Sequence, residues 1–558
     1  MWLLDRLRPS DWQRMLMLAA VAGVLGALAT IGFREAIFAI ERALFGRDDG
    51  LVRIAAGLPW WQRLLVPACG GVLAGLLLAW ARQVPERKPS GDYMEAIALG
   101  EGRLGVRVSL LRAMSSAATV ASGGAIGREG PMVQLAALAG SLIGRWRRLP
   151  VPRQRLLVAC GAAAGVATAY NAPIAGALFV AEIVLRSLAL ESLGALIVAA
   201  VAAHLTSGAL LGYAPVYQMP AFVLPHGGTA LLLALLGVVA GLLAPLYLGL
   251  LDLVRAAYGR WLAPPWLKLG SGGLIVGAIS ILRPEVWGNG YSVVNAILQG
   301  GWLWQALLVV LALKLLAVAA TTGSGAVGGI FTPTLFVGAV TGALFGGLVH
   351  AWLPGSLPPS ASVAVGMGAF LAACTHAPLT SVLMIFEMTE NYGVVVPLML
   401  ACVLAYSISR ALHARSIYAG AAEVSAQAPA LTMAVDFLRS DSATILAHQS
   451  LRELEEAFVR HRWQHVYVLD DQRRFLGAVA VHDLAPLIKS GPPDDIDWVA
   501  RLLRRDYPRV QETMPVWQVL ETFAKHPGER LPVLDVQGRL RGHVTKTDLV
   551  LMFRERLA

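Results

Sequence analysis

Long apolar stretches, separated by short polar or glycine-rich segments, occupy the chain from about residue 10 to residue 420. A helix that crosses the hydrocarbon core of a bilayer takes about 20 apolar residues. The stretches near that length are 15–45, 61–80, 230–254, 267–282, 304–320 and 395–408. This pattern predicts a mostly α-helical domain that crosses a membrane several times.

Three further apolar segments, 131–142, 173–185 and 332–349, are shorter or are interrupted by glycine and proline. A helix that breaks inside a bilayer leaves backbone N–H and C=O groups without partners, unless the break is buried in protein or faces water. We therefore expect these broken helices to line the path of a transported solute.

Two of the interruptions belong to an internal duplication. Residues 127–131 read Gly-Arg-Glu-Gly-Pro, and residues 328–333 read Gly-Gly-Ile-Phe-Thr-Pro. Each motif is followed, at nearly the same distance, by an Ala-Pro pair and then by a glutamate, Glu182 in the first copy and Glu387 in the second. Duplicated membrane halves with helices broken at matching places are typical of transporters whose binding site lies near the bilayer midplane.

Both motifs have the composition of a helix start that binds an anion. The first turn of a helix has N–H groups without intrahelical partners and roughly half a unit of positive charge. Proline suits this turn, as at Pro131 and Pro333, and glycine lets the backbone approach an ion closely. Kinking and close helix packing would explain one motif alone, but the pair favours an anion site.

Among the acidic residues, Glu129 is the candidate for a functional role, because it lies in the first of the two motifs. A carboxylate inside a bilayer is costly unless it is solvated, paired or protonated. At a helix start, Glu129 would experience the same favourable potential as a transported anion, so it would occupy the anion's place and leave on protonation. This predicts a gate or a proton carrier. The alternative is a capping carboxylate that is paired with Arg128.

The last part of the chain, from about residue 430, is polar and contains a second duplication. Residues 465–484 align without gaps on residues 530–549, and nine of the twenty pairs are identical. Each copy reads as strand, turn, strand and a helix start at Asp-Leu, and each follows a helical stretch, 450–461 or 515–525. The tail therefore predicts two repeated α/β units.

The composition agrees with a chain that has one part in lipid and one part in water. Of the 558 residues, 56% are hydrophobic and only 15% are charged, whereas about a quarter of an average soluble domain is charged. The net charge of +10 fits a membrane protein with positive inner loops better than a nucleic-acid-binding protein. The four cysteines have irregular spacing and predict neither a disulfide framework nor a metal site. No nucleophile–base pair stands out, so an enzyme is not expected.

The motifs 127–131 and 328–333, with Ser416-Ile417-Tyr418 at the end of the apolar region, closely resemble those of the CLC chloride channels and proton-coupled exchangers. The segments 92–96, 287–292 and 387–389 resemble most the bacterial ClcB-type branch. The resemblance implies two inverted repeats with broken helices, and a homodimer with one anion pathway per subunit.

The resemblance also implies roles for single residues. Glu129 would be the external gating glutamate, and the Tyr418 hydroxyl would bind the central anion. Backbone N–H groups would be donated to that anion by three residues of the second motif. The complete expected anion-binding set is Ser90, Gly127, Arg128, Gly130, Gly329, Ile330, Phe331 and Tyr418, in which Gly329, Ile330 and Phe331 are the backbone donors.

Two positions depart from the family pattern. The segment of the family's central serine reads Pro-Ser-Gly-Asp-Tyr at 89–93, in place of Gly-Ser-Gly-Ile-Pro. Here Asp92 and Glu95 resemble a capping box, which would satisfy the start of that helix internally. In the proton-coupled exchangers, a second, inward-facing glutamate occupies the position of Ile183. Because isoleucine cannot relay a proton, a passive channel is an alternative to an exchanger.

The repeated unit of the tail resembles the CBS domain, and two in tandem form the usual pair, which can bind adenine nucleotides in its cleft. The resemblance implies that Asp548 would hold ribose hydroxyls and that Thr545 would hold a phosphate, whereas the first copy has Ala480 in place of the threonine. The alternative is that Thr545 and Asp548 only cap the following helix.

Together these observations predict a membrane domain at 1–425 and CBS domains at 430–490 and 495–558. The predicted function is transport of chloride and similar small monovalent anions, gated by Glu129, as a channel or a proton-coupled exchanger. The alternative is a secondary transporter for another anion. Chloride, protons and membrane lipid are the expected partners, with no nucleic acid and no cofactor other than an adenine nucleotide at the CBS pair. The expected location is the inner membrane of the cell, with a cytoplasmic tail.

Overall fold

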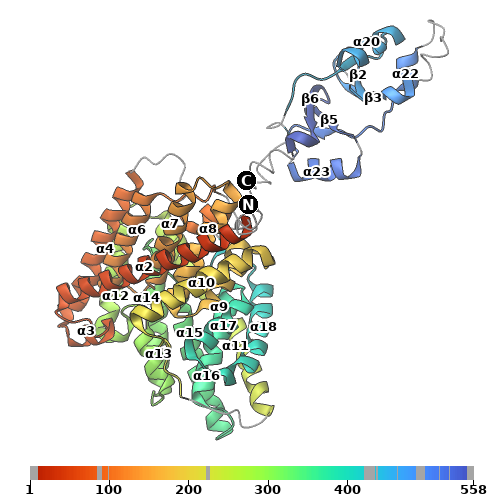
Figure 1. The fold of residues 1–558 in the computed structure, drawn as a ribbon. Coiled ribbons are helices and arrows are strands. Elements are labelled where there is room, and N and C mark those ends of the chain that lie inside the picture. Colours follow the sequence, from red (N-terminus) through yellow and green to blue (C-terminus); the bar gives the residue numbers. More distant parts are fainter. Residues whose placement is uncertain are drawn as a thin grey trace, which may run out of the picture. The chain divides into compact units, whose positions relative to one another are not determined.

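The computed structural model describes residues 11–83, 91–98, 100–220, 227–419, 434, 438–461, 463–484, 497–514, 516–526 and 528–549. The chain divides into two compact units, Met1–Ala421 and Ala422–Ala558. The first unit is helical, and the second contains two small sheets (Figure 1). The predicted domain boundaries at 425, 430, 490 and 495 lie outside the described residues.

The helices of the first unit follow one another in this order: α2 (Asp11–Phe45), α3 (Leu51–Gly57), α4 (Trp60–Gln83), α5 (Tyr93–Ala98), α6 (Val106–Ala121), α7 (Glu129–Trp146), α8 (Val151–Tyr170), α9 (Pro173–Phe179), the π-helix η1 (Val180–Leu185), α10 (Leu190–Leu211), α11 (Gly227–Arg260), α12 (Pro265–Leu282), the 3-10 helix η2 (Pro284–Val286), α13 (Tyr291–Leu298), α14 (Trp304–Gly323), α15 (Phe331–Trp352), α16 (Pro359–Thr375), α17 (Pro378–Thr389), the 3-10 helix η3 (Tyr392–Val394) and α18 (Val395–Leu412).

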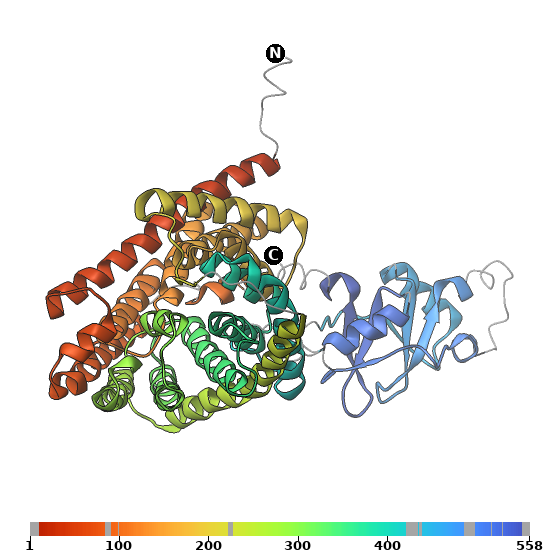
Figure 2. The same cartoon turned by 90° about the horizontal axis from the view of Figure 1, so that it is seen from below.

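Eight helices in the described part of the chain are long and apolar enough to cross a membrane. They are α2, α4, α10, α11, α12, α14, α15 and the segment Tyr392–Leu412, which contains α18. All six stretches predicted from the apolar pattern are among them, and α10 was missed. The segment 332–349, predicted as short or interrupted, lies in α15, a continuous helix of 22 residues, so that prediction was wrong. Large apolar side chains such as Leu246 and Val396 point outward, 69% and 68% exposed, as a lipid-facing surface requires. Figure 2 shows α2 (red) along one edge of this unit.

The internal duplication is visible in the backbone. Helices α8 and α16 both end in a left-handed residue, Asn171 (φ 54°) and His376 (φ 58°). In each copy an alanine and then a proline start the next helix, α9 or α17. Glu387, near the end of α17, reaches the start of α9, and Glu182, in the π-helix η1 that continues α9, reaches the start of α17. The two helices therefore run antiparallel, as two inverted repeats require.

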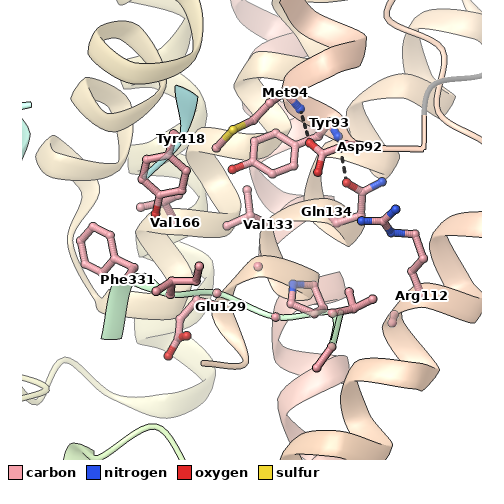
Figure 3. Close-up of a pocket in the computed structure, with 18 of the residues that line it drawn as sticks. Asp92, Tyr93, Met94, Arg112, Glu129, Val133, Gln134, Val166, Phe331 and Tyr418 are labelled. Atoms are coloured by element: carbon pink, nitrogen blue, oxygen red, sulfur yellow. Dashed lines mark hydrogen bonds between the residues drawn. The ribbon is translucent and has the colours of Figure 1, made fainter. Parts of the chain in front are cut away.

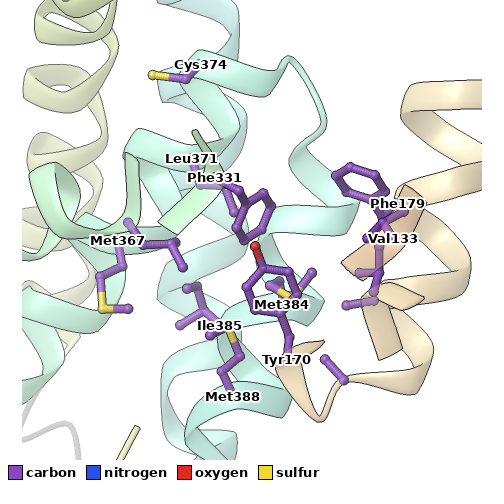
Figure 4. Packing of buried hydrophobic residues seen from close by; sticks show 14 of the residues in the cluster. Val133, Tyr170, Phe179, Phe331, Met367, Leu371, Cys374, Met384, Ile385 and Met388 are labelled. Atoms are coloured by element: carbon purple, nitrogen blue, oxygen red, sulfur yellow. The ribbon is translucent and has the colours of Figure 1, made fainter. Parts of the chain in front are cut away.

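Helices within each copy pack closely through glycine. A Cβ at Gly161 in α8 would meet the Ala136 carbonyl of α7, and a Cβ at Gly366 in α16 would meet the Gly338 carbonyl of α15. Between the copies lies a buried apolar cluster around Phe331 (Figure 4). The ring of Phe331 lies 4.8 Å from that of Tyr170 and 6.1 Å from that of Phe179, measured between centroids. This cluster holds the broken helices of both copies together.

The second unit contains two sheets of the same design. In each, a short strand pairs in parallel with the first strand of a hairpin: β1-β2-β3 and β4-β5-β6. The elements are β1 (Thr444–Leu446), α20 (Leu451–His461), β2 (His465–Leu469), β3 (Phe475–Ala480), α22 (Trp498–Leu502), β4 (Val510–Gln511), α23 (Val516–Lys525), β5 (Arg530–Leu534) and β6 (Leu540–Thr545). The two hairpins fall on the aligned repeats 465–484 and 530–549, so the predicted strand–turn–strand units are confirmed.

Candidate functional site

The two glycine- and proline-containing motifs are in direct contact. The N–H of Gly127 donates to the Gly329 carbonyl, and the N–H of Gly329 donates to the Gly127 carbonyl, each at 2.8 Å. These two bonds form an antiparallel bridge. Since α7 starts at Glu129 and α15 starts at Phe331, the bridge holds both helix starts side by side inside the protein.

The bridge corrects the expected role of two backbone amides. The N–H groups of Gly127 and Gly329 are donated to each other's carbonyls, so the expected donation from the Gly329 N–H to an anion does not fit this geometry. Of the residues that follow, Ile330 caps the start of α15 and Phe331 is its first residue. The first N–H groups of a helix have no intrahelical acceptor, so these two amides remain the suitable donors.

Close contact between the motifs depends on glycine. A Cβ at Gly130 would lie 3.1 Å from backbone atoms of Gly328 and Gly329, and a Cβ at Gly328 would lie 2.9 Å from the Gly127 carbonyl oxygen. A Cβ at Gly127 would collide with Oε2 of Glu129. The backbones therefore approach each other as the glycine content of the motifs predicts.

Glu129 is buried, with 3% of its surface exposed, yet its carboxylate is weakly held. Asn289 donates its Nδ2 hydrogen to Oε1 at 3.3 Å, and Oε2 has no hydrogen-bond partner among the described residues. The Arg128 guanidinium lies over the ring of Phe38, 5.3 Å from its centroid. This geometry does not support the alternative in which Glu129 is a capping carboxylate paired with Arg128.

A cavity of about 590 Å³ adjoins the two helix starts (Figure 3). Of the expected site residues, Glu129, Gly130, Gly329, Ile330, Phe331 and Tyr418 line it, while Gly127 and Arg128 are not among its lining residues. The Tyr418 ring packs edge-on against Phe179, 5.7 Å between centroids. The fold therefore gathers residues from both repeats and from the segment after α18 around one space.

Six polar side chains that line the cavity were not predicted as site residues: Arg82, Asp92, Tyr93, Arg112, Gln134 and Tyr170. Tyr93 at the start of α5, Arg82 at the end of α4 and Arg112 in α6 all border it. Figure 3 draws Tyr93 between Tyr418 and Arg112. Two guanidinium groups at the wall of a cavity favour small anions inside it. No local motif marks Arg82, Tyr93 and Arg112, because each comes from a different helix.

The start of α5, where the family's central serine belongs, is satisfied internally. The Asp92 side chain accepts from the Met94 N–H at 2.8 Å, and the Gln134 side chain accepts from the Tyr93 N–H at 2.9 Å. The predicted capping box is thus half present, because the second acceptor is Gln134 of α7 rather than Glu95. Ser90 lies outside the described residues.

The two repeated glutamates hold each other's helix starts. Glu182 accepts hydrogen bonds from the N–H and the hydroxyl of Thr380 in α17, at 2.8 and 2.6 Å, and from the Leu379 N–H at 3.4 Å. Glu387 accepts from the N–H groups of Ile174 and Ala175 in α9, at 3.0 and 2.7 Å. Both carboxylates therefore act as caps across the repeat interface.

Lys314 positions the segment that presents Asn289 to Glu129. Its ammonium is fully buried in α14 and donates to the carbonyls of Val286 and Gly288, at 2.8 and 2.7 Å. These two carbonyls lie in the segment that leads to Asn289. In the sequence, Lys314 stands out because it is the only Asp, Glu, Lys or Arg between residues 304 and 386.

In the tail, Thr545 and Asp548 already have partners. The Asp548 N–H donates to the Thr545 hydroxyl at 3.0 Å, and that hydroxyl donates to Asp548 Oδ2 at 2.7 Å. The Arg439 guanidinium donates to both carboxylate oxygens of Asp548, at 2.8 and 2.6 Å. In the first copy, Arg504 holds Asp483 in the same way, at 2.9 Å for each bond. The hydrogen bonds of Thr545 and Asp548 fit the alternative of a helix cap.

Known proteins share both parts of this design. Residues 70–410 match the family described as voltage gated chloride channel, and residues 434–490 and 499–555 each match the CBS domain. Among curated proteins, the chain is 56% identical over 412 residues to a putative ClcB-like chloride channel protein of Ralstonia nicotianae, which covers 73% of this chain and 96% of that protein. It is 44% identical over 411 residues to the voltage-gated ClC-type chloride channel ClcB of Citrobacter koseri, covering 73% and 98%.

Two solved structures have a similar fold. A slow cyanobacterial Cl⁻/H⁺ antiporter aligns with a TM-score of 0.65 at 27% identity, and the alignment covers 74% of this chain and 98% of that one. A eukaryotic CLC transporter aligns with a TM-score of 0.61 at 19% identity, covering 96% and 98%. The second likeness concerns the fold alone.

Proposed function

The chain belongs to the family of voltage-gated chloride channels, and from this membership we propose how its own residues carry the transport. It is a multi-pass membrane protein that transports chloride, as a channel or as a proton-coupled exchanger. Our proposal is that the anion passes the cavity beside the two bridged motifs and that Glu129 gates its passage.

The observation that carries this proposal is the weak binding of a buried carboxylate. A charge in the interior of a membrane protein is expensive unless hydrogen bonds or an ion pair compensate it. Among the described residues, Glu129 has a single hydrogen bond, of 3.3 Å, and it lies at the start of α7, whose helix dipole favours an anion. A protonated Glu129 would lose that dipole attraction, and a chloride ion would replace it.

The anion would be bound by dipoles rather than by a fixed cation. Ile330 and Phe331 would donate backbone N–H groups, Tyr418 would donate its hydroxyl, and Tyr93 lies in position to add a second hydroxyl. Gly130 would let the backbone come close to the ion. Arg112 and Arg82 would raise the local anion concentration in the cavity. Ser90, Gly127 and Arg128 stay proposed contributors: Gly127 and Arg128 do not line the cavity, and Ser90 lies outside the described residues.

Flux measurements decide between exchanger and channel. We would record chloride and pH together for the purified full-length protein in liposomes. Proton movement against its gradient, driven by a chloride gradient, identifies an exchanger, whereas chloride flux without linked protons identifies a channel. Ile183, at the position of the second glutamate, favours the channel.

Replacing Glu129 tests the gate itself. In Glu129→Gln the side chain keeps its size and cannot ionise, so we expect chloride flux to lose its pH dependence. Flux measured at matched protein density checks this. A variant whose flux keeps the pH dependence of the wild type would exclude the gating role.

The side-chain contacts of Asp548 in the tail do not fit the expected binding of an adenine nucleotide. Binding of a ribose by Asp548 would require the Arg439 guanidinium to leave both carboxylate oxygens. We therefore assign the CBS pair a regulatory or bracing role without a nucleotide step. Because the named relatives are bacterial, the proposed location is the inner membrane, with a cytoplasmic tail. A homodimer of the membrane unit, with domains at 1–425, 430–490 and 495–558, completes the proposal.

A further inference from the structure

Five buried polar atoms near Glu129 have no hydrogen-bond partner in the described part of the protein. They are Oε2 of Glu129 and the hydroxyl oxygens of Tyr170, Tyr217, Tyr291 and Thr332. Tyr170, Tyr217 and Thr332 are 2%, 0% and 0% exposed. An unsatisfied buried polar group costs about 1–3 kcal/mol, and native proteins have few of them. Five together form a buried polar cluster whose hydrogen bonds are incomplete.

These five groups face one another. The hydroxyls of Tyr170 and Tyr291 both lie near the Thr332 hydroxyl, and that of Tyr291 lies near the Glu129 carboxylate, close enough for contact but without the geometry of a regular hydrogen bond. The ring of Tyr217 lies 5.5 Å from that of Tyr291, and its hydroxyl interacts with both Tyr291 and Glu129. The residues come from the end of α8, the segment after α10, the start of α13 and the starts of α7 and α15. The fold thus gathers hydroxyls around one carboxylate.

The hydroxyl group of Tyr170 connects this cluster with the cavity. Tyr170 lines the cavity and interacts with Tyr418, which also lines it. Figure 4 shows the Tyr170 hydroxyl directed toward Phe331. Glu129 borders the cavity as well, but Figure 3 shows its carboxylate turned away from Tyr93 and Arg112, and Oε2 is shielded from solvent. Tyr170 therefore lies at the border between the cavity and the shielded Oε2.

We propose that Tyr170, Tyr291 and Thr332 hold water beside Oε2 of Glu129, and that these hydroxyls and the water carry protons between the cavity and the carboxylate. A buried water needs a polar site with two to four partners, and the hydroxyls supply both donors and acceptors. We call the three side chains the hydroxyl relay. The inference rests on the proposed gating role of Glu129.

The transfer involves O–H bonds alone. A hydronium ion in the cavity gives a proton to the first oxygen of the row, each oxygen passes one proton on, and the last water protonates Glu129. One proton enters for each that arrives, and every tyrosine and threonine hydroxyl ends the step as it began, neutral. No second acidic residue is required, so the isoleucine at position 183 does not prevent proton coupling.

The charged and ionisable groups that face Glu129 do not compete with this route. They are Tyr170, Tyr217, Tyr291 and Tyr418, with Arg128 beside Glu129 and Glu41 of α2 facing Arg128. Among them, Glu41 is the other carboxylate, and it interacts with Arg128 and Asp48. Glu129 is therefore the proton acceptor of this cluster.

Isosteric removal of each hydroxyl tests the relay. Full-length Tyr170→Phe, Tyr291→Phe, Thr332→Val and the triple variant would be reconstituted in liposomes, with chloride and pH recorded together. Tyr247→Phe is the matched control, because the Tyr247 hydroxyl is also buried and has no regular hydrogen bond within the described residues, while its neighbours are Thr334, Cys374 and Tyr418 rather than Glu129. We expect chloride-driven proton movement to fall at least about tenfold in the triple variant, as for loss of a proton-transfer step. Chloride flux should persist, and the control should keep both.

The outcomes separate the relay from the gate. An unchanged ratio of protons to chloride in the triple variant would overturn the relay, and so would a wild-type protein that moves chloride without protons. Neither result affects the gate, which the pH dependence of Glu129→Gln tests. If the triple variant does not fold, the single variants decide. Tyr170→Phe should then show the largest loss, and an unchanged ratio in all three removes the relay.

Discussion

Carboxylates at helix starts are held in two different ways in the two regions of the membrane unit. At the interface between the repeats, Glu182 and Glu387 take up N–H groups of α17 and α9, with shortest hydrogen bonds of 2.6 and 2.7 Å. Beside the cavity, Glu129 has one hydrogen bond of 3.3 Å and an oxygen without a partner in the described structure.

This difference shows how one physical device serves two purposes. A helix start attracts any anion. At α9 and α17 the protein supplies the anion permanently, from the opposite repeat, and the helix starts are closed to other ligands. At α7 the carboxylate belongs to the same helix and is weakly bound, so a chloride ion can compete with it. The number and length of hydrogen bonds, rather than the residue type, separate structural glutamates from the gate.

The largest expected effect is on stability. Glu387→Ala and Glu182→Ala each leave helix-start N–H groups without an acceptor, so we expect each to lower the free energy of unfolding by about 2 kcal/mol. Glu129→Ala, which removes one long hydrogen bond, should cost about 0.5 kcal/mol or less. Thermal unfolding of the detergent-solubilised protein measures the three, with the exposed Glu191→Ala as control. Equal losses for Glu129→Ala and Glu387→Ala would contradict the distinction.

A smaller effect, on the gate, is expected at Gly127. A Cβ there collides with Oε2 of Glu129, the flexible end of a side chain, and lies 2.9 Å from the Gly329 carbonyl oxygen. Gly127→Ala should displace the carboxylate and reduce the pH dependence of chloride flux several-fold, on the order of 1 kcal/mol of lost preference. Gly347→Ala, where a Cβ meets nothing within 4 Å, is the control. If flux in Gly127→Ala keeps the pH dependence of the wild type, then gating does not depend on the position of the Glu129 carboxylate beside Gly127.

The smallest effect is expected in the tail, where Asp548 is as firmly held as Glu182. Burial lowers the pKa of the neighbouring His543 from 6.5 to about 4, with Arg530 and Arg439 adding to the shift and Asp441 opposing it. The unfolded tail therefore binds more protons between these pH values. Its stability is fully present above pH 6.5 and is lost as the pH falls toward 4.

Hydrogen exchange of residues 540–545 in the full chain checks this, after correction for the intrinsic pH dependence of exchange. Protection of β6 should decrease as the solution is acidified across that range. His543→Gln cannot titrate and should lose less protection. If both proteins lose protection equally, another group controls the acid sensitivity of the tail.

Sequence reasoning found the elements and missed the contacts between them. The apolar pattern located all six predicted membrane stretches, and the repeated motifs located the two helix starts that meet at the Gly127–Gly329 bridge. Two features were not predicted. The N–H groups of Gly127 and Gly329 donate to each other's carbonyls, and Tyr93 and Arg112 line the cavity. Both depend on which helices become neighbours, and the local sequence does not encode that.

By itself, the sequence determined the membrane and tail parts, both duplications and the family. Hydropathy, helix-start composition and motif spacing are properties of short segments, so they can be read along the chain without knowledge of the fold. Only the tertiary structure decided which glutamate is held and which is weakly bound. It also decided that the Arg439 guanidinium donates to the Asp548 carboxylate, and that hydroxyls from four segments lie near Glu129. Hydrogen bonds between residues distant in the chain depend on distances of a few tenths of an ångström, and only the packed fold sets those distances.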